Sequence, residues 1–241
     1  MMGIIVIIMA LLAPALTGIR AASGVTKAAY EISGILEQAR TYAMANHTYV
    51  LAGIAEVDAA QPESARPQVP GVGRVAVVTV ASRDGTRGHD LANAQASWQA
   101  SYANGANLLP LGKLAVFENI HLAETLGKPP ETGPMARYTA TGRNLIGSAS
   151  SKSATPFTWP LGSPLGSGGG EYDFEKVITF DPQGVARVQY GQGHGMVEWL
   201  EIDLQQTREN VLPAAPDDPN PGNHVAIMIN GLTGAIRLFR P

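Results

Sequence analysis

The first 45 residues constrain the fold more than any other part of the chain. Met1 to Leu16 form an uncharged, almost wholly apolar run, and the first charged residue is Arg20. A helical pattern then continues without a break, because apolar residues recur at alternating steps of three and four. The members of this stripe are Ala22, Val25, Ala29, Ile32, Leu36, Ala39 and Ala43. The pattern predicts one continuous helix from about Met2 to Asn46, roughly 65 to 70 Å long.

The opposite face of this predicted helix is polar. Lys27 and Glu31 are spaced for an i,i+4 ion pair, and Glu37 and Arg40 for an i,i+3 pair. The apolar stripe is rich in alanine, which suits close packing against another helix or a sheet. Three glycines, Gly18, Gly24 and Gly34, lower the helix propensity and permit bending.

Three interpretations of the apolar run compete. A secretory signal peptide has such a run, but a positive segment should precede it, and none does. A buried core helix is hard to reconcile with uniform apolarity at a chain end. The third interpretation is a membrane and assembly helix, although the run alone is shorter than the roughly 20 residues that span a bilayer. We prefer the third because the helical pattern continues beyond the run. The residues assigned to the membrane half are Ile4, Ile5, Ile7, Ile8, Leu11, Leu12 and Pro14.

The remaining residues, 47–241, predict a β-rich head. Strands are expected at 47–54, 75–81, 113–122, 176–180, 185–190, 196–204, 224–229 and 235–239. A turn at Asp181 to Gly184 joins two of them, because Asp-Pro-Gln-Gly is favourable turn chemistry. Long loops are predicted at 56–74, 82–107 and 123–172, where proline and glycine accumulate. The last of these is interpreted as an excursion from the sheet rather than a second domain.

Composition excludes several kinds of site. The chain has no cysteine, so disulfides, thiolate metal sites and cysteine nucleophiles are absent. A formal net charge of −3 gives no general attraction to nucleic acid. Hydrophobic residues make up 45% and charged residues 15%, which is too polar for a protein with many membrane spans.

No motif predicts catalysis. The five histidines have no metal-binding spacing: His47, His89, His121, His194 and His224. The glycine-rich stretch from Gly191 to Gly195 lacks the lysine and the following helix of a phosphate-binding loop. No Gly-x-Ser-x-Gly motif occurs. We therefore predict no catalytic residue, no enzyme activity, no cofactor and no small-molecule substrate.

Two weaker signals remain as alternatives. Several oxygen ligands fall within one short loop, which suits a Ca²⁺ ion, and these are Asp217, Asp218, Asn220 and Asn223. A solvated turn explains them better. Arg237 and Arg240 would contact DNA if the chain bound it, but two arginines on a net-acidic chain are thin support. Nucleic acid is therefore not an expected partner.

The stretch IIVIIMALLAPALTGIRAA resembles the N-terminal helix of type IV pilins and type II secretion pseudopilins, with Pro14 at the position of that family's proline. The order of Leu109-Pro110, the turn FDPQG at Phe180 and the closing IMINGLTGAIRLF is similar to GspH/FimT-type minor pseudopilins. The resemblance covers about residues 1–55, 108–122 and 174–240. The prepilin peptidase motif is missing, so about eight mature residues and a leader are expected upstream of Met1, and cleavage and N-methylation are not assigned.

The resemblance implies an α+β fold, with a long N-terminal helix packed on an antiparallel β-sheet head. It divides the chain into a membrane and assembly helix at 1–46 and a head at 47–241. The implied function is a non-enzymatic subunit of a secretion pseudopilus or type IV pilus-like filament. The subunit would be held in the bacterial inner membrane by a single pass, with its head in the periplasm. Its partners would be other pilin-like subunits, contacted through the N-terminal helices, and the secretion machinery.

Three other functions stay open from the sequence. The chain could be a secreted structural or adhesive β protein whose signal peptide is removed. It could be a minor pilin of DNA uptake. An enzyme is the most distant of the alternatives.

Overall fold

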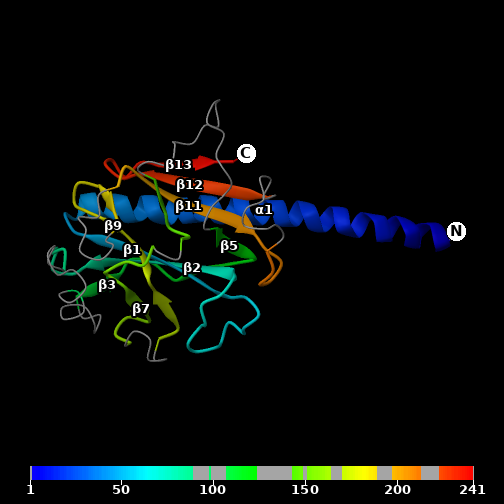
Figure 1. Ribbon diagram of the computed structural model, residues 1–241, viewed down its shortest axis with the longest axis horizontal. Helices are drawn as coiled ribbons and strands as arrows, with labels where there is room; N and C mark the ends of the chain where they lie inside the picture. Colours follow the sequence, from blue (N-terminus) through cyan, green and yellow to red (C-terminus); the bar gives the residue numbers. More distant parts are fainter. Residues whose placement is uncertain are drawn as a thin grey trace.

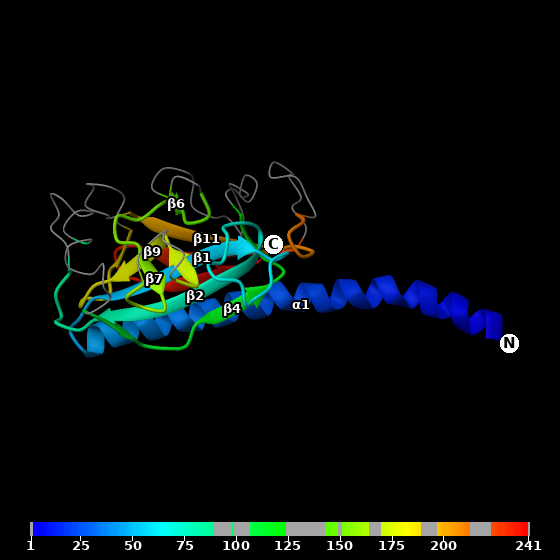
Figure 2. The same ribbon diagram turned by 90° about the horizontal axis from the view of Figure 1, so that it is seen from below.

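A computed structural model describes residues 2–88, 98, 107–123, 143–148, 151–163, 170–188, 197–212 and 223–240, and the side chains of the first helix from Gly24 onward. The helix α1 spans Met2–Ala45. It runs along the head and then continues beyond it, so the N-terminus lies far from every strand (Figures 1 and 2).

Two antiparallel sheets form the head. Sheet A has six strands in the order β10-β9-β1-β2-β3, with β4 also paired to β2. These strands are β1 (Val50–Asp58), β2 (Gly73–Ser82), β3 (Leu108–Pro110), β4 (Ala115–Glu118), β9 (Lys176–Phe180) and β10 (Ala186–Arg187). The register of β1 on β2 runs from Val50 opposite Ala81 to Asp58 opposite Gly73.

Sheet B has five strands in the order β13-β12-β11-β5, with β6 paired in parallel to β11. Its strands are β5 (Ile120–Ala123), β6 (Arg143–Leu145), β11 (Trp199–Gln206), β12 (His224–Asn230) and β13 (Ile236–Phe239). A separate two-stranded hairpin pairs β7 (Phe157–Trp159) with β8 (Tyr172–Phe174).

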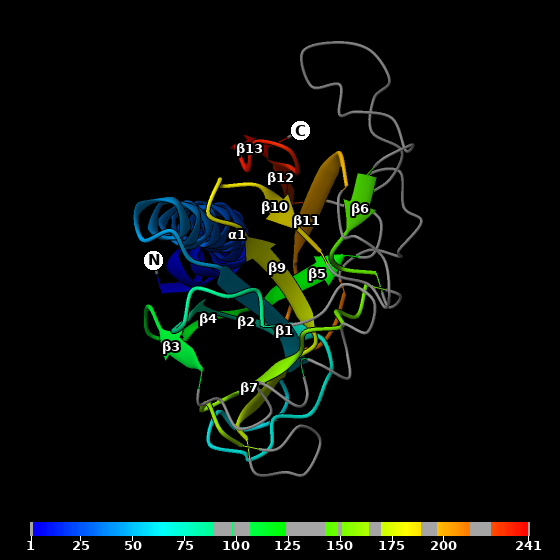
Figure 3. The same cartoon turned by 90° about the vertical axis from the view of Figure 1, so that its left-hand side faces the viewer.

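The main core lies where α1 meets the inner faces of both sheets. Alternate residues of β1, β2, β9, β11 and β12 point inward, among them Ile54, Val77, Ile178, Ile202 and Ile227, and each is at most 1% exposed. Seen along its axis, α1 lies between β13 on one side and β3 and β4 on the other (Figure 3). The helix therefore fills the opening between the two sheets.

The outer face of sheet A is covered by a second apolar cluster. Leu51, Val78 and Val80 of the sheet pack with the aromatic residues of the β7–β8 hairpin and with Trp98. Phe174 is fully buried and its ring lies 5.3 Å from that of Phe157. Gly53 of β1 leaves the space that these rings fill, because a Cβ there would lie 2.6 Å from Phe157.

The outer face of sheet B is polar instead. Glu201, Asp203 and Gln205 alternate along β11 with the inward-facing leucine and isoleucine residues. Glu201 is 0% exposed and Asp203 is 1% exposed. Each has a polar or electrostatic partner, as a buried carboxylate requires.

The predicted fold class, α+β with a long N-terminal helix packed on an antiparallel β-sheet head, is wrong. The structure is mostly antiparallel β-sheet: of the residues whose side chains are described, 44% lie in strands and 22 lie in the helix. The error concerns the share of strand and helix. The stretch 123–172, predicted to be loop, contains the short strands β6 and β7, and the apolar half of α1, predicted to lie outside the head, does lie beyond the sheets (Figure 2), so strands outweigh helix in the head.

One predicted strand is two strands in different sheets. The segment 113–122 was expected to be continuous, but Asn119 has a φ of 59° and separates β4 in sheet A from β5 in sheet B. Asparagine tolerates this left-handed conformation better than most residues. The hairpin predicted around Asp181 to Gly184 is present, with β9 at the predicted bounds and Asp181 Oδ1 accepting hydrogen bonds from the backbone N–H groups of Gln183 and Val185.

Candidate functional site

The end of the head from which α1 projects is here called the proximal end. It is formed by the loop 59–72, between β1 and β2, and by the turn 207–211, after β11 (Figure 1). The two segments touch, because Gly73, with a φ of 106°, lies directly against the carbonyl oxygen of Glu209. A side chain at residue 73 would displace that contact.

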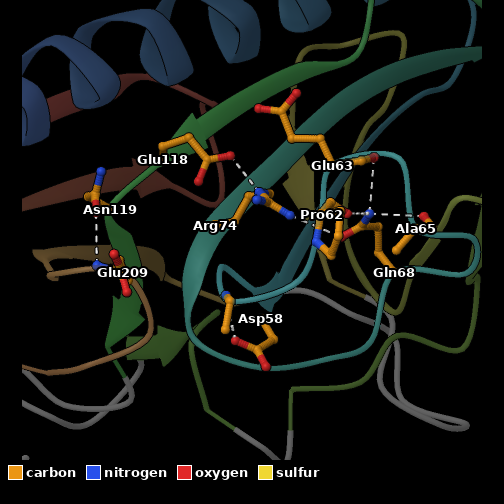
Figure 4. Close-up of polar contacts among 10 residues, drawn as sticks. Asp58, Pro62, Glu63, Ala65, Gln68, Arg74, Glu118, Asn119 and Glu209 are labelled. Carbon is orange, nitrogen blue, oxygen red and sulfur yellow. Dashed lines mark hydrogen bonds and ion pairs between the residues drawn. The ribbon is translucent and has the colours of Figure 1, made fainter.

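The loop 59–72 is held by a buried glutamine. The Gln68 side-chain amide donates to the carbonyl oxygens of Pro62, Glu63 and Ala65, at 3.0, 3.1 and 2.9 Å. Its Oε1 accepts a hydrogen bond from Arg74, which in turn pairs with Glu118 (Figure 4). We call Gln68, Arg74 and Glu118 the loop brace. Because it ties the loop to β2 and β4, the loop is fixed relative to sheet A.

Further contacts tie the proximal end to sheet B. His121 Nδ1 of β5 lies 2.7 Å from Glu56 Oε1 of β1, and that carboxylate also accepts a hydrogen bond from the Gly73 N–H. The backbone N–H of Glu209 donates to Asn119 Oδ1 at 2.9 Å. On this ordered surface two apolar side chains face solvent, Val69 at 46% exposed and Val211 at 61%.

The opposite end, here called the distal end, consists of the turns 83–88, 181–184 and 231–235 (Figure 1). These turns are also hydrogen-bonded internally. The Asp84 carboxylate accepts hydrogen bonds from the Thr86 backbone and from the Ser82 and Thr86 hydroxyls, which lowers its pKa. Asn230 Oδ1 accepts hydrogen bonds from Leu232 and Thr233. Leu232 is 57% exposed on this turn.

The side of α1 that faces away from the sheets forms the third surface, here called the open helix face. Its residues are Gly24, Lys27, Tyr30, Glu31, Gly34, Gln38, Thr41 and Ala45. A Cβ added at Gly24 or Gly34 would meet nothing within 4 Å. Tyr30 is 65% exposed, and Lys27 pairs with Glu31 at 3.6 Å. The two glycines therefore have no packing role within the described chain.

The predicted stripe of α1 lies against the sheets. Its members from Val25 onward are all at most 1% exposed and belong to the main core: Val25, Ala29, Ile32, Leu36, Ala39 and Ala43. The side chain of Ala22 lies outside the described residues. So do those of the membrane-half residues, whose backbone is part of α1: Ile4, Ile5, Ile7, Ile8, Leu11, Leu12 and Pro14.

The structure describes only some residues of the two weaker alternatives. Asp217, Asp218 and Asn220 lie outside the described residues, and the amide of Asn223 donates to Gln206 Oε1 at 3.2 Å. Arg237 and Arg240 are exposed at the edge of sheet B. Among the residues that the structure describes, no three His, Asp or Glu side chains could hold a metal ion.

The loop brace and the open helix face were not predicted as sites. The stretch 56–74 was interpreted as a loop, and nothing local shows that Gln68 folds back on three carbonyl groups. The glycines of α1 were noticed, but as points of bending. Their exposure depends on which helix face the sheets cover.

Comparison of this chain with family models, with curated proteins and with solved structures finds no match. Within the part of α1 whose side chains are described, and in the rest of the described chain, no helix is long and apolar enough to cross a membrane.

Proposed function

We propose that the chain is a non-enzymatic subunit of a type II secretion or type IV pilus-like filament that assembles through α1. The proposal is supported chiefly by the open helix face, where Gly24 and Gly34 stand exposed in the middle of a helix. Glycine in a helix interior costs about 1 kcal/mol relative to alanine. Within one subunit nothing offsets this loss of helix stability, because no described atom packs against either glycine. Between subunits, glycine lets two helix backbones approach closely.

The apolar run supports the same proposal. Residues 2–16 are part of α1 and lie beyond the sheets, so the head leaves this part of the helix uncovered (Figure 2). Such a segment needs an apolar surrounding, since exposing it to water is unfavourable. We propose that the inner membrane provides it before assembly, with the head in the periplasm, and that neighbouring subunits provide it afterwards.

The experiment uses the absence of native cysteine. Gln38→Cys places one thiol on the open helix face, and Arg237→Cys places one on the exposed side of β13, where the neighbouring Ile236 and Leu238 pack against the core instead. In membranes of cells that express the full chain, oxidation should give a disulfide-linked dimer of the Gln38→Cys variant and none of the Arg237→Cys variant. A dimer of neither variant, or of both equally, would contradict assembly through this face.

A paired substitution tests the role of the glycine. Gly34→Leu should abolish the Gln38→Cys cross-link, because the larger side chain prevents close approach. The matched control is Thr41→Leu, which lies on the same face but replaces a residue that already has a side chain. Both variants should keep the thermal stability of the starting protein or exceed it, since no described atom occupies the space beside residue 34. Equal cross-linking in the two variants would show that two helices do not pack closely at Gly34.

A further inference from the structure

We infer that Asn230 is a latent deamidation site, which the closed head holds unreactive through the hydrogen bond of the next residue, Gly231. The two residues lie at the distal end of the head, where β12 ends and the turn to β13 begins. The inference concerns a chemical modification of the head and does not depend on assembly through α1.

The reaction needs only these two residues and water. The backbone nitrogen of Gly231 attacks Cγ of Asn230, a C–N bond forms, and the bond from Cγ to the side-chain nitrogen breaks. Ammonia leaves with the proton of the backbone nitrogen, and a five-membered succinimide ring remains. Water then opens the ring at either carbonyl and gives aspartate or isoaspartate. Because glycine has no Cβ, no side chain on the attacking residue hinders ring closure.

The side chain of Asn230 is already arranged as the electrophile. Its Oδ1 accepts hydrogen bonds from the backbone N–H groups of Leu232 and Thr233, at 3.1 and 2.9 Å, and from the Thr233 hydroxyl at 3.0 Å. Donors placed around a carbonyl oxygen stabilise the negative charge that develops there when the carbon is attacked. The turn therefore favours reaction at Cγ once a nucleophile is available.

The nucleophile is withheld by packing around Gly231. Its N–H donates to the carbonyl oxygen of Glu198 at 2.9 Å, and its carbonyl oxygen accepts from the Ala186 N–H at 3.1 Å. A Cβ on Gly231 would collide with the carbonyl oxygen of Val197. To attack Asn230, the nitrogen must lose its proton and leave Glu198. Reaction therefore follows local opening of the turn, and its rate scales with the open fraction.

The isoaspartate product would mark a head that has opened. Isoaspartate adds one carbon atom to the main chain directly before Gly231, which has no spare room beside Val197. The bond from Ala186 to Gly231 joins β10 of sheet A to this turn of sheet B. A head that has opened and reacted therefore cannot restore the same contact between its two sheets.

The first test measures deamidation of the full chain in detergent, in mildly alkaline buffer, with and without urea. Peptide mass mapping gives the rate at each site. Asn230 should react at least about tenfold more slowly without urea, which corresponds to an opening free energy of about 1.4 kcal/mol. Asn104, which also precedes a glycine and lies outside the described residues, gives the reference rate in urea. Equal rates at Asn230 in the two conditions, or a faster rate without urea, would overturn the inference.

A pair of glycine variants tests whether the turn controls the reaction. Gly234 has a φ of 68°, and a Cβ there would collide with the carbonyl oxygen of Gly184. Gly234→Ala should therefore loosen the turn and raise the rate at Asn230 without urea, while the rate in urea stays the same. The matched control is Gly24→Ala, whose Cβ meets nothing within 4 Å and should change neither rate.

A Gly234→Ala chain that melts at a lower temperature but deamidates at the native rate would show that this turn does not protect Asn230. If that variant does not fold, the comparison of the unaltered chain with and without urea decides. The consequence is tested by refolding after prolonged incubation in urea. The unaltered chain should regain a lower melting temperature than before, whereas Asn230→Ser, which cannot form the succinimide, should regain its own. Equal recovery of both would show that the modification leaves the distal end intact, against the inference.

Discussion

The outer faces of the two sheets are both buried, yet they are built from opposite chemistry. The face of sheet A is apolar and is covered by the aromatic β7–β8 hairpin and Trp98. The face of sheet B carries buried Glu201, Asp203 and Gln205. Apolar burial is non-directional and tolerates small shifts, whereas buried carboxylates need particular partners in particular positions. Sheet A therefore supplies stability, whereas the buried polar groups of sheet B specify one arrangement of their neighbours.

The largest effect is expected on the apolar side. Phe174→Ala removes a fully buried ring that stacks on Phe157, and should lower the free energy of unfolding by about 3–5 kcal/mol. Urea unfolding of the full chain in detergent measures this change. The control is Leu232→Ala, at an exposed position, which should change stability by no more than about 0.5 kcal/mol. A small effect of Phe174→Ala would mean that packing of the β7–β8 hairpin on sheet A contributes little to the free energy of unfolding.

A smaller effect is expected on the polar side. Glu201→Gln keeps the shape of the side chain but replaces a carboxyl oxygen by an amide NH₂ group, and should cost about 1–3 kcal/mol because the buried amide N–H groups would lack acceptors. Glu209→Gln, on the exposed turn, is the matched control and should be near neutral. If Glu201→Gln were neutral too, the shape of the side chain rather than its hydrogen-bonding chemistry would specify this face.

The smallest effect depends on pH and concerns Tyr172 of the hairpin. Burial, reinforced by the nearby Glu171 carboxylate, raises the pKa of Tyr172 above its ordinary value of 10.0. A raised pKa means that the folded state holds the proton more tightly than the unfolded state. The resulting stability is fully present below pH 10 and is lost as pH rises through the folded-state pKa.

Unfolding midpoints measured from pH 8 to 11 should therefore fall more steeply in the native chain than in Tyr172→Phe. Tyr30→Phe, at an exposed position, should leave the alkaline slope unchanged. Equal slopes in all three proteins would show that ionisation of Tyr172 does not oppose the packing on sheet A.

The sequence predicted the elements that depend on local pattern. The helical stripe from Val25 to Ala43 and the hairpin at Asp181 to Gly184 both follow from residue spacing and turn chemistry, and the structure contains both. Elements that depend on distant partners were missed. The short strand β6 pairs with the distant β11, and β7 pairs with β8 across the connection 160–171, so no local period reveals these three strands.

The candidate site was harder to predict than the fold, for the same reason. Arg74 and Glu118 are 44 residues apart, and they meet only because β4 pairs with β2. Gln68 gains its role from a loop closure that has no sequence signature. Likewise, the exposure of Gly34 follows from the packing of the opposite helix face, which is a property of the whole head.

The break at Asn119 has a consequence for how the head comes apart. At this one residue the chain leaves sheet A and enters sheet B, so β4 and β5 are covalently continuous although they belong to different sheets. Detaching β4 from sheet A would therefore disturb β5 in sheet B, and the reverse also holds. In addition, α1 packs on the inner faces of both sheets. The head should therefore exchange its slowest amide protons in both sheets at one common rate, as a single cooperative unit.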